Sequence, residues 1–243
     1  MPDSPRNSIE FKVWARHALF TDPVTKIGGE KCSYHEPTYE ALKGITKSIY
    51  WKPTLVWVID EVRVMKRIRT QTKGTKPLEF SGGNSLAIYT FLADVEYQVR
   101  THFEWNIHRP DLKGDQIDGK HHTVAKRMLD RGGRQDIFLG TRDCQGYVEA
   151  CEIGSGEGAY DDAGQLAFGV MFHGFDYPDE TGNDNLHARF WRPTMVDGKI
   201  QFDRPDSDSM IRKFVRPMNV KPFGLGKNLL SVAEEEVQMG DSL

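Results

Sequence analysis

Cysteine is scarce in this chain of 243 residues, and long apolar runs are missing. Cys32, Cys144 and Cys151 are an odd number of cysteines and too few for the disulfide framework of a small secreted protein. No apolar run approaches the roughly 18–20 residues of a membrane-spanning helix. The first residues, MPDSPRNSIEF, lack the basic and then apolar pattern of a signal peptide. We therefore expect a cytoplasmic protein that has no membrane as a partner.

Motifs for metals and for nucleotide cofactors are also missing. Cys144 and Cys151 do not have the spacing of a zinc site, and adjacent histidines such as His121 and His122 point apart on a helix. The stretch 114–120 fits GxxxxGK, the first seven positions of a P-loop. However, it lacks the Ser or Thr that would hold Mg²⁺, and it places two Asp where the backbone should cradle phosphate. We expect neither a metal nor a cofactor.

Charge is distributed unevenly along the chain. The net charge of −3 argues against a protein that coats nucleic acid. Residues 43–76 hold nine Lys and Arg against two acidic residues, whereas 147–187 hold nine Asp and Glu and no Lys or Arg. We interpret this as a basic face for a polyanion and an acidic lobe for another role, such as a protein partner. The alternative is two solvated surfaces that differ by chance.

The spacing of apolar residues predicts alternating strands and helices up to residue 153. The expected strands cover 9–20, 55–69, 94–108, 136–139 and 145–153. One helix opens at Thr38 and stops before Pro53, and a second covers 121–131. Counting the last two strands as one, the order is strand, helix, strand, strand, helix, strand. This order predicts an α+β, ferredoxin-like (βαββαβ) fold with the helices on one face of the sheet.

The second of these strands is expected to carry a basic stripe. Side chains alternate between the two faces of a strand. Val62 and Ile68 would face one way, and Arg63, Arg67 and Arg69 the other.

After residue 153 the pattern changes to short strands and Gly-rich turns, with a hairpin signal at Asp197-Gly198. We divide the chain into a ferredoxin-like domain (1–153), a β-rich extension (154–205) and a poorly patterned tail (206–243). We expect the acidic end of the tail, at 234–236, to be mobile.

The most informative stretch places Lys120 and His121 at the start of the helix over 121–131. A lysine and the exposed N–H groups of a helix start favour an anion such as phosphate. The same helix end disfavours a protonated imidazole, so that His121 would stay neutral and able to exchange protons. His121 also lies at the boundary of the buried face, where it would be both oriented and reachable. Taken alone, a histidine such as His121 is more often structural, and a tyrosine such as Tyr50 is more often a core or rim aromatic.

Several longer strings resemble one known family. They are Ala18-LFTDPVTKIGGEK, Pro37-TYEALKGI, Ile49-YWKPT, Phe103-EWNIHRPDL, Gly119-KHH, Gly132-GRQDIFLGTRDCQGY and Asp176-YPDETG. In these strings the chain resembles the CRISPR-associated proteins of Cas family five, subtype d, from the type I-C system. That family belongs to the repeat-associated mystery protein superfamily, whose members bind and often cut RNA. The resemblance extends to about Phe202.

The resemblance implies a metal-independent endoribonuclease that cleaves CRISPR precursor RNA within its repeats. The protein would then stay on the 5′ tag of the guide RNA, as a subunit of the type I-C effector complex. The family's catalytic set falls on Tyr50, Lys120 and His121. Tyr50 would act as a base only if a neighbour such as Lys120 lowered its pKa, and would otherwise position the RNA.

The basic residues expected to contact RNA phosphates are Arg67, Arg69, Lys73, Lys126, Arg131 and Arg134.

The alternative is a non-catalytic subunit that only caps and holds the guide RNA. An intact set of Tyr50, Lys120 and His121 favours catalysis, because a scaffold would not need it. The acidic region 147–187 suits contact with a basic neighbouring subunit. The sequence leaves open the repeat sequence, the cleavage position, the order of assembly and whether duplex DNA is bound as well.

Overall fold

The structure is a computed structural model that describes residues 6–78, 80–83 and 85–220. It is an α+β fold that is rich in sheet. The strands are β1 (Ser8–Ala18), β2 (Leu55–Val64), β3 (Thr70–Thr75), β4 (Ala87–Trp105), β5 (Ile137–Phe138), β6 (Gln145–Ala150), β7 (Gln165–Ala167), β8 (Met171–Asp176), β9 (Asn185–Trp191), β10 (Thr194–Val196), β11 (Lys199–Gln201) and β12 (Ile211–Pro217). The helices are α1 (Pro23–Ile27), α2 (Tyr39–Ile49), α3 (Lys120–Leu129), α4 (Pro178–Thr181) and the 3₁₀ helix η1 (Pro110–Asp115).

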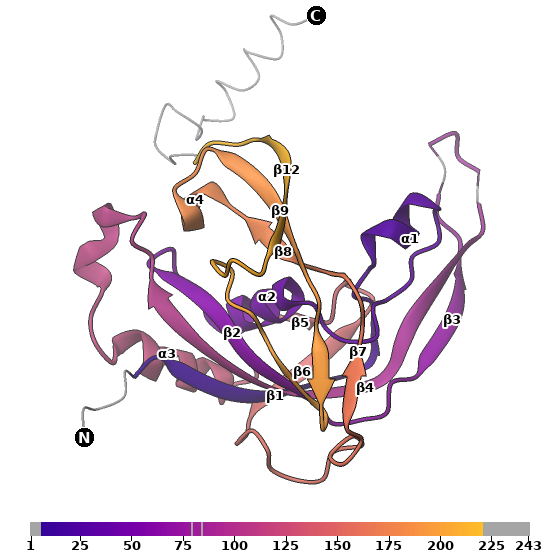
Figure 1. Cartoon of the computed structure of the whole chain (residues 1–243), viewed down its shortest axis with the longest axis horizontal. Helices are drawn as coiled ribbons and strands as arrows, with labels where there is room; N and C mark the ends of the chain where they lie inside the picture. Colours follow the sequence, from indigo (N-terminus) through magenta and orange to yellow (C-terminus); the bar gives the residue numbers. More distant parts are fainter. Residues whose placement is uncertain (1–5, 79, 84, 221–243) are drawn as a thin grey trace, which may run out of the picture.

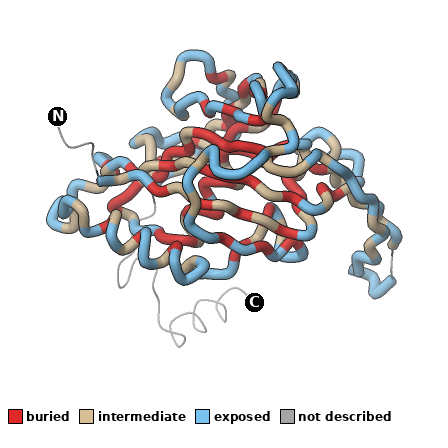
Figure 2. The backbone as a smooth tube through the Cα atoms, turned by 90° about the horizontal axis from the view of Figure 1, so that it is seen from below, coloured by how far each residue is buried: buried red, intermediate tan, exposed pale blue. Residues whose placement is uncertain are grey.

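The main sheet is built around the long strand β4. Its strand order is β5-β6-β1-β4-β2-β11-β10-β7. β3 pairs with the first residues of β4, from Ala87 to Leu92 (Figure 1). The four strands β6-β1-β4-β2 are antiparallel throughout. Alternation along β1 and β4 buries Phe11, Val13 and Val99 on one face, which α2 and α3 cover. Figure 2 shows the buried residues gathered in the middle of the molecule, whereas exposed residues follow its outer segments.

Capping side chains and backbone conformation set the ends of the two helices that cover the sheet. The side chain of Thr38 caps α2 by accepting a hydrogen bond from the Ala41 N–H. The helix ends at Tyr50, whose extended backbone leads into Pro53. α3 begins after Gly119, which takes the left-handed conformation at φ 69°. Both helices agree with the sequence prediction to within three residues.

The segments after residue 153 build on to this sheet and add a second one. β7, β10 and β11 extend the main sheet beyond β2, while β12-β9-β8 form a separate three-stranded sheet. The predicted hairpin is confirmed, because Asp197 and Gly198 join β10 to β11 with positive φ angles of 47° and 78°. Strand β12 lies within the tail 206–243, for which no regular element was predicted. Residues 234–236 lie outside the described residues.

The predicted basic stripe on β2 is not formed. β2 ends at Val64, so Arg67 and Arg69 lie on the connection to β3. Arg63 is only 4% exposed, because Asp161 pairs with its guanidinium at 2.7 Å. The Gln98 side chain and two backbone carbonyls accept its other N–H groups. The alternation was read correctly at Arg63, but the outward face at this point is covered by residues 154–161.

Some of the charges in the basic and acidic segments pair with each other inside the fold. Lys43 and Lys47 of the basic segment both pair with Glu180 of the acidic segment, as Arg63 does with Asp161. These contacts neutralise part of the predicted basic face against part of the predicted acidic lobe. Three of the nine basic residues and two of the nine acidic residues are thereby paired within the protein.

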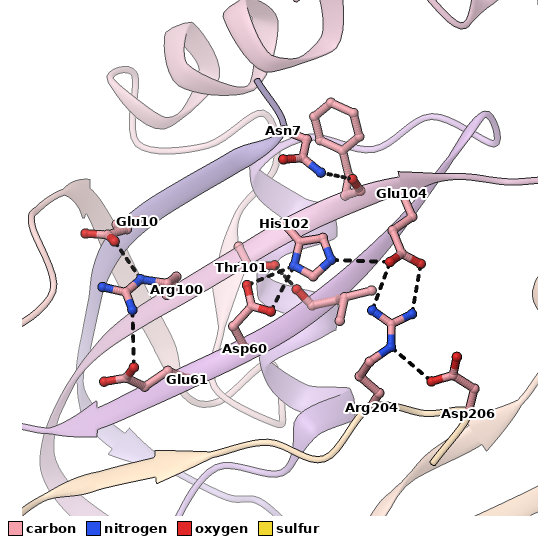
Figure 3. A network of polar contacts seen from close by, with 12 residues as sticks. Asn7, Glu10, Asp60, Glu61, Arg100, Thr101, His102, Glu104, Arg204 and Asp206 are labelled. Carbon is pink, nitrogen blue, oxygen red and sulfur yellow. Dashed lines mark hydrogen bonds and ion pairs between the residues drawn. The ribbon is translucent and has the colours of Figure 1, made fainter. Parts of the chain in front are cut away.

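The face of β4 that points away from α2 carries a network of polar contacts (Figure 3). His102 Nδ1 lies 2.8 Å from Asp60, and this hydrogen bond raises the pKa of the imidazole. Glu104 joins His102 to Arg204, which follows β11. The network therefore ties the C-terminal segments to the main sheet. Among the described residues, no helix is both long and apolar enough to cross a bilayer.

Candidate active site

Tyr50, Lys120 and His121 come together where the end of α2 meets the start of α3. The Tyr50 hydroxyl oxygen lies 2.8 Å from Nδ1 of His121, although 71 positions separate the two residues in the sequence. The Tyr50 backbone carbonyl also accepts a hydrogen bond from the Trp57 indole, which anchors the end of α2 to β2. The structure thus brings together the three residues that the sequence singled out.

His121 is enclosed by the protein. The residue is 1% exposed, and the Trp105 and Phe103 rings of β4 meet its ring edge-on at 5.6 and 6.4 Å between centroids. The expectation that His121 lies at a reachable rim is therefore wrong for this structure. The helical periodicity correctly placed His121 near Ala125 on the buried side, but it could not reveal that the segment before the helix folds over the ring.

Both ring nitrogens of His121 have partners, and these assign the protons. Nε2 lies 2.8 Å from the backbone carbonyl of Asp115, which can only accept, so Nε2 donates. In the neutral ring Nδ1 is then an acceptor, and the Tyr50 hydroxyl donates to it.

Tyr50 has an environment that keeps its hydroxyl protonated. Burial raises the pKa of Tyr50, and the nearby Asp115 carboxylate raises it further. The lowering by Lys120 that a catalytic base would need is not found, because the Lys120 ammonium pairs with Asp115 instead. Tyr50 is therefore a hydrogen-bond donor to His121 in this structure.

Asp115, at the end of η1, is the residue of the site that the sequence reasoning missed. Its carboxylate contacts Lys120 Nζ at 2.5 Å and the Thr54 hydroxyl at 2.8 Å, and lies 3.4 Å from His121 Nε2. The hydrogen bonds from Lys120 and then Thr54 lower the pKa of this carboxyl. The sequence did hold a signal, since Asp115 was one of the two acids that spoiled the P-loop pattern beside Lys120.

Three of the six predicted RNA-binding residues lie near this site. Lys126 is exposed on α3, and Arg131 and Arg134 are exposed on the turn that follows it. The Arg134 N–H donates to the carbonyls of Ser48 and Ile49, immediately before Tyr50. Arg131 and Arg134 also line a groove of about 560 Å³.

The other three predicted RNA-binding residues lie at the far end of β4. Lys73 is on β3, which pairs with the first residues of β4, and its ammonium lies 5.3 Å from the Phe91 ring centroid. Arg67 is exposed, and Arg69 pairs with Asp94 at 3.0 Å. Tyr89, which pairs with Lys73, is 16 residues before Trp105, so at about 3.3 Å per residue the two lie on the order of 50 Å apart along the strand. The six residues therefore form two separate basic groups.

In the part of the chain that the structure describes, no three His, Cys, Asp or Glu side chains cluster in a way that could hold a metal ion. The candidate site instead consists of a phenol, an imidazole, an ammonium and a carboxylate. These groups can donate and accept protons and can bind an anion.

A family model described as CRISPR-associated protein (Cas_Cas5) matches residues 8–203, and the chain accordingly belongs to the Cas5d family. A solved structure described as a CRISPR-associated protein is 32% identical, with a TM-score of 0.71, and the match covers 84% of this chain and 96% of that one.

Two curated relatives are each named CRISPR pre-crRNA endoribonuclease Cas5d. The relative from Thermus thermophilus is 26% identical over 196 residues, which is 76% of this chain and 80% of the relative. The relative from Mannheimia succiniciproducens is 41% identical over 66 residues, so this match spans only 27% of the chain and 28% of the relative.

Proposed function

We propose that this protein is a metal-independent endoribonuclease that cleaves CRISPR precursor RNA within its repeats. After cleavage it stays on the 5′ tag of the guide RNA, as a subunit of the type I-C effector complex. The observation that carries the proposal is the contact between Tyr50 and His121 beside Lys120, within a chain of the Cas5d family. The names of the two curated relatives support the same activity.

The proposed reaction uses the RNA as its own nucleophile. The 2′-hydroxyl oxygen attacks the adjacent phosphorus while the bond to the 5′-oxygen breaks, leaving a 2′,3′-cyclic phosphate and a 5′-hydroxyl. His121 exchanges the proton of the attacking or leaving oxygen, and Lys120 stabilises the charge that develops on the phosphorane. Tyr50 orients the imidazole, because its raised pKa makes it a poor base.

The finer features of the fold belong to the same proposal. The strand order β6-β1-β4-β2, with α2 and α3 on one face, supports a ferredoxin-like arrangement. We assign RNA processing to residues 1–153, with 154–205 as a β-rich extension and 206–243 as a tail. We also propose a cytoplasmic location, because the substrate is a transcript made there.

A second candidate function is guide holding without cleavage. The burial of His121, with a partner at each ring nitrogen, favours this alternative for the protein without RNA. Cleavage requires that one of these partners give way when RNA binds.

The deciding experiment incubates the purified protein with its own repeat RNA in EDTA. We expect a single cut that leaves a 2′,3′-cyclic phosphate, and no cut when the scissile nucleotide carries a 2′-deoxy sugar. His121→Ala should lower the single-turnover rate by about 10²–10⁴-fold. His122→Ala is the matched control, because the neighbouring ring contacts the Ser8 carbonyl instead and should leave the rate unchanged. A requirement for Mg²⁺ would contradict the mechanism.

A further inference from the structure

Asp115 places an anion at the point where the proposed reaction needs the RNA phosphate. Its carboxylate lies between the Lys120 ammonium and His121 Nε2, and the Thr54 hydroxyl donates to one of its oxygens. Thr54 is 1% exposed, so its hydroxyl is a buried donor directed at an anionic oxygen. Such a set of donors is equally suited to the non-bridging oxygens of a phosphodiester.

We propose that Asp115 occupies the position of the scissile phosphate in the RNA-free protein and that RNA displaces it on binding. This inference rests on the proposed function. Two anions cannot share Lys120 and Thr54 without strong repulsion, so the carboxylate must withdraw as the phosphate arrives. Asp115 is thereby an internal competitor that lowers the affinity of the site for RNA.

Displacement of Asp115 would also free the histidine. Its backbone carbonyl is the partner of His121 Nε2, so withdrawal of this one residue releases both Lys120 and the imidazole. The same movement exposes the ring nitrogen that the substrate must reach. The closed geometry of the free site and an active enzyme are compatible on this basis.

The segment that carries Asp115 is suited to such a movement. η1 contains no buried residue, and Ile107 before it and Ile117 after it are 78% and 51% exposed. Little apolar area is therefore lost from the core when the segment withdraws. Its attachment to the site consists mainly of the polar contacts of Asp115.

The test compares Asp115→Asn with Asp118→Asn, using a repeat RNA with a 2′-deoxy sugar at the scissile nucleotide so that binding is measured without cleavage. Asp118 is exposed on the same segment, so its substitution makes the same change in net charge away from Lys120. We expect D115N to bind about tenfold more tightly than the wild type at roughly 50 mM salt, where screening is weak. D118N should bind like the wild type.

The salt dependence of RNA binding gives a second, independent measurement. In the wild type Lys120 exchanges one anion for another, whereas in D115N it becomes a new phosphate contact. The slope of log K against log salt should therefore become steeper by about 0.7–0.9 in D115N only. Thermal melts establish that D115N is folded, and Asp115→Ser, which also removes the charge, should give the same readings.

Cleavage of the all-ribose RNA by the wild type separates the two proposals. If the wild type cleaves but neither Asp115 variant binds more tightly than D118N, the displacement is refuted and Asp115 is a positioning residue. If the wild type does not cleave but the Asp115 variants bind more tightly with a steeper slope, the phosphate position stands and the nuclease proposal fails.

Discussion

At the scale of single residues, Tyr50 illustrates how burial selects among the roles of a side chain. The sequence left its role open between base and positioning group. Burial and the Asp115 carboxylate raise its pKa, and its hydroxyl lies 2.8 Å from His121 Nδ1. A phenol of this kind keeps its proton and fixes the orientation of the imidazole. The sequence could identify Tyr50 by resemblance, but the raised pKa and the contact with His121 are visible only in the three-dimensional arrangement.

Replacement of Tyr50 by Phe should therefore affect catalysis more than binding. The ring packing is kept, but Nδ1 of His121 loses its partner and the imidazole its fixed orientation. We expect the single-turnover cleavage rate to fall about 10- to 100-fold, or about 1.4 to 2.7 kcal/mol in activation free energy. RNA affinity should stay within about twofold.

Tyr160→Phe is the control, since that hydroxyl accepts a hydrogen bond from the Ile68 N–H, away from the site. An unchanged rate in the Tyr50 variant would show that the hydroxyl has no part in the reaction.

At the scale of elements, the sequence predicted regular structure best where local signals and burial agree. The alternating strand β1 and the two amphipathic helices were found within a few residues, whereas β4 begins at Ala87, seven residues before the predicted start. The prediction failed for elements with weak apolar patterns. β12 is exposed along most of its length, and η1 buries no side chain, so neither shows a periodic stripe.

The lack of a periodic pattern also explains why the sequence did not predict Asp115 as part of the site. Lys120 and His121 open a helix that the sequence shows clearly, whereas Asp115 ends an irregular segment. Its contacts to Thr54 and His121 depend on how that segment folds over the sheet. No spacing rule in the sequence reports such a contact.

The attachment of α2 to α4 gives a test at this scale. Lys43 is 1% exposed and pairs with Glu180, which also accepts from Lys47 at 3.0 Å. Glu180→Gln leaves the Lys43 ammonium buried without an anionic partner, so we expect a loss of about 3 kcal/mol in the free energy of unfolding. Urea denaturation measures this loss.

Asp179→Asn is the matched control for this pair. Asp179 is the exposed neighbour on α4, and its substitution should cost less than about 0.5 kcal/mol. The double variant Lys43→Met, Glu180→Leu should recover much of the stability, because it removes both charges. Equal stability of Glu180→Gln and Asp179→Asn would contradict the importance of the pair.

At the scale of the whole molecule, the stability should depend on pH through Glu36. This residue is 2% exposed, and its carboxyl oxygens have no hydrogen-bond partner among the described residues. Burial raises its pKa from an ordinary 4.5 to about 8. Between these two values the unfolded chain has released the proton that the folded chain still holds.

The free energy of unfolding should accordingly fall as the pH rises from about 4.5 to 8, by up to about 1.4 kcal/mol per pH unit from this group. Glu36→Gln cannot ionise, so it should remove this slope. Urea denaturation at several pH values between 5 and 8 provides the comparison. Parallel pH profiles for the wild type and the Gln variant would show that Glu36 ionises equally in both states.

The pairing of β11 with β2 has a consequence for any attempt to dissect the molecule. Arg63 sits opposite Lys199 across this pair and is neutralised by Asp161. A fragment that stops at residue 153 would lack β11 and Asp161. The backbone N–H and C=O groups of β2 that pair with β11 would then be unpaired, and Arg63 would lack its carboxylate partner. Unpaired edge strands tend to pair between molecules, so we expect such a fragment to aggregate and to be unsuitable for measuring the nuclease activity alone.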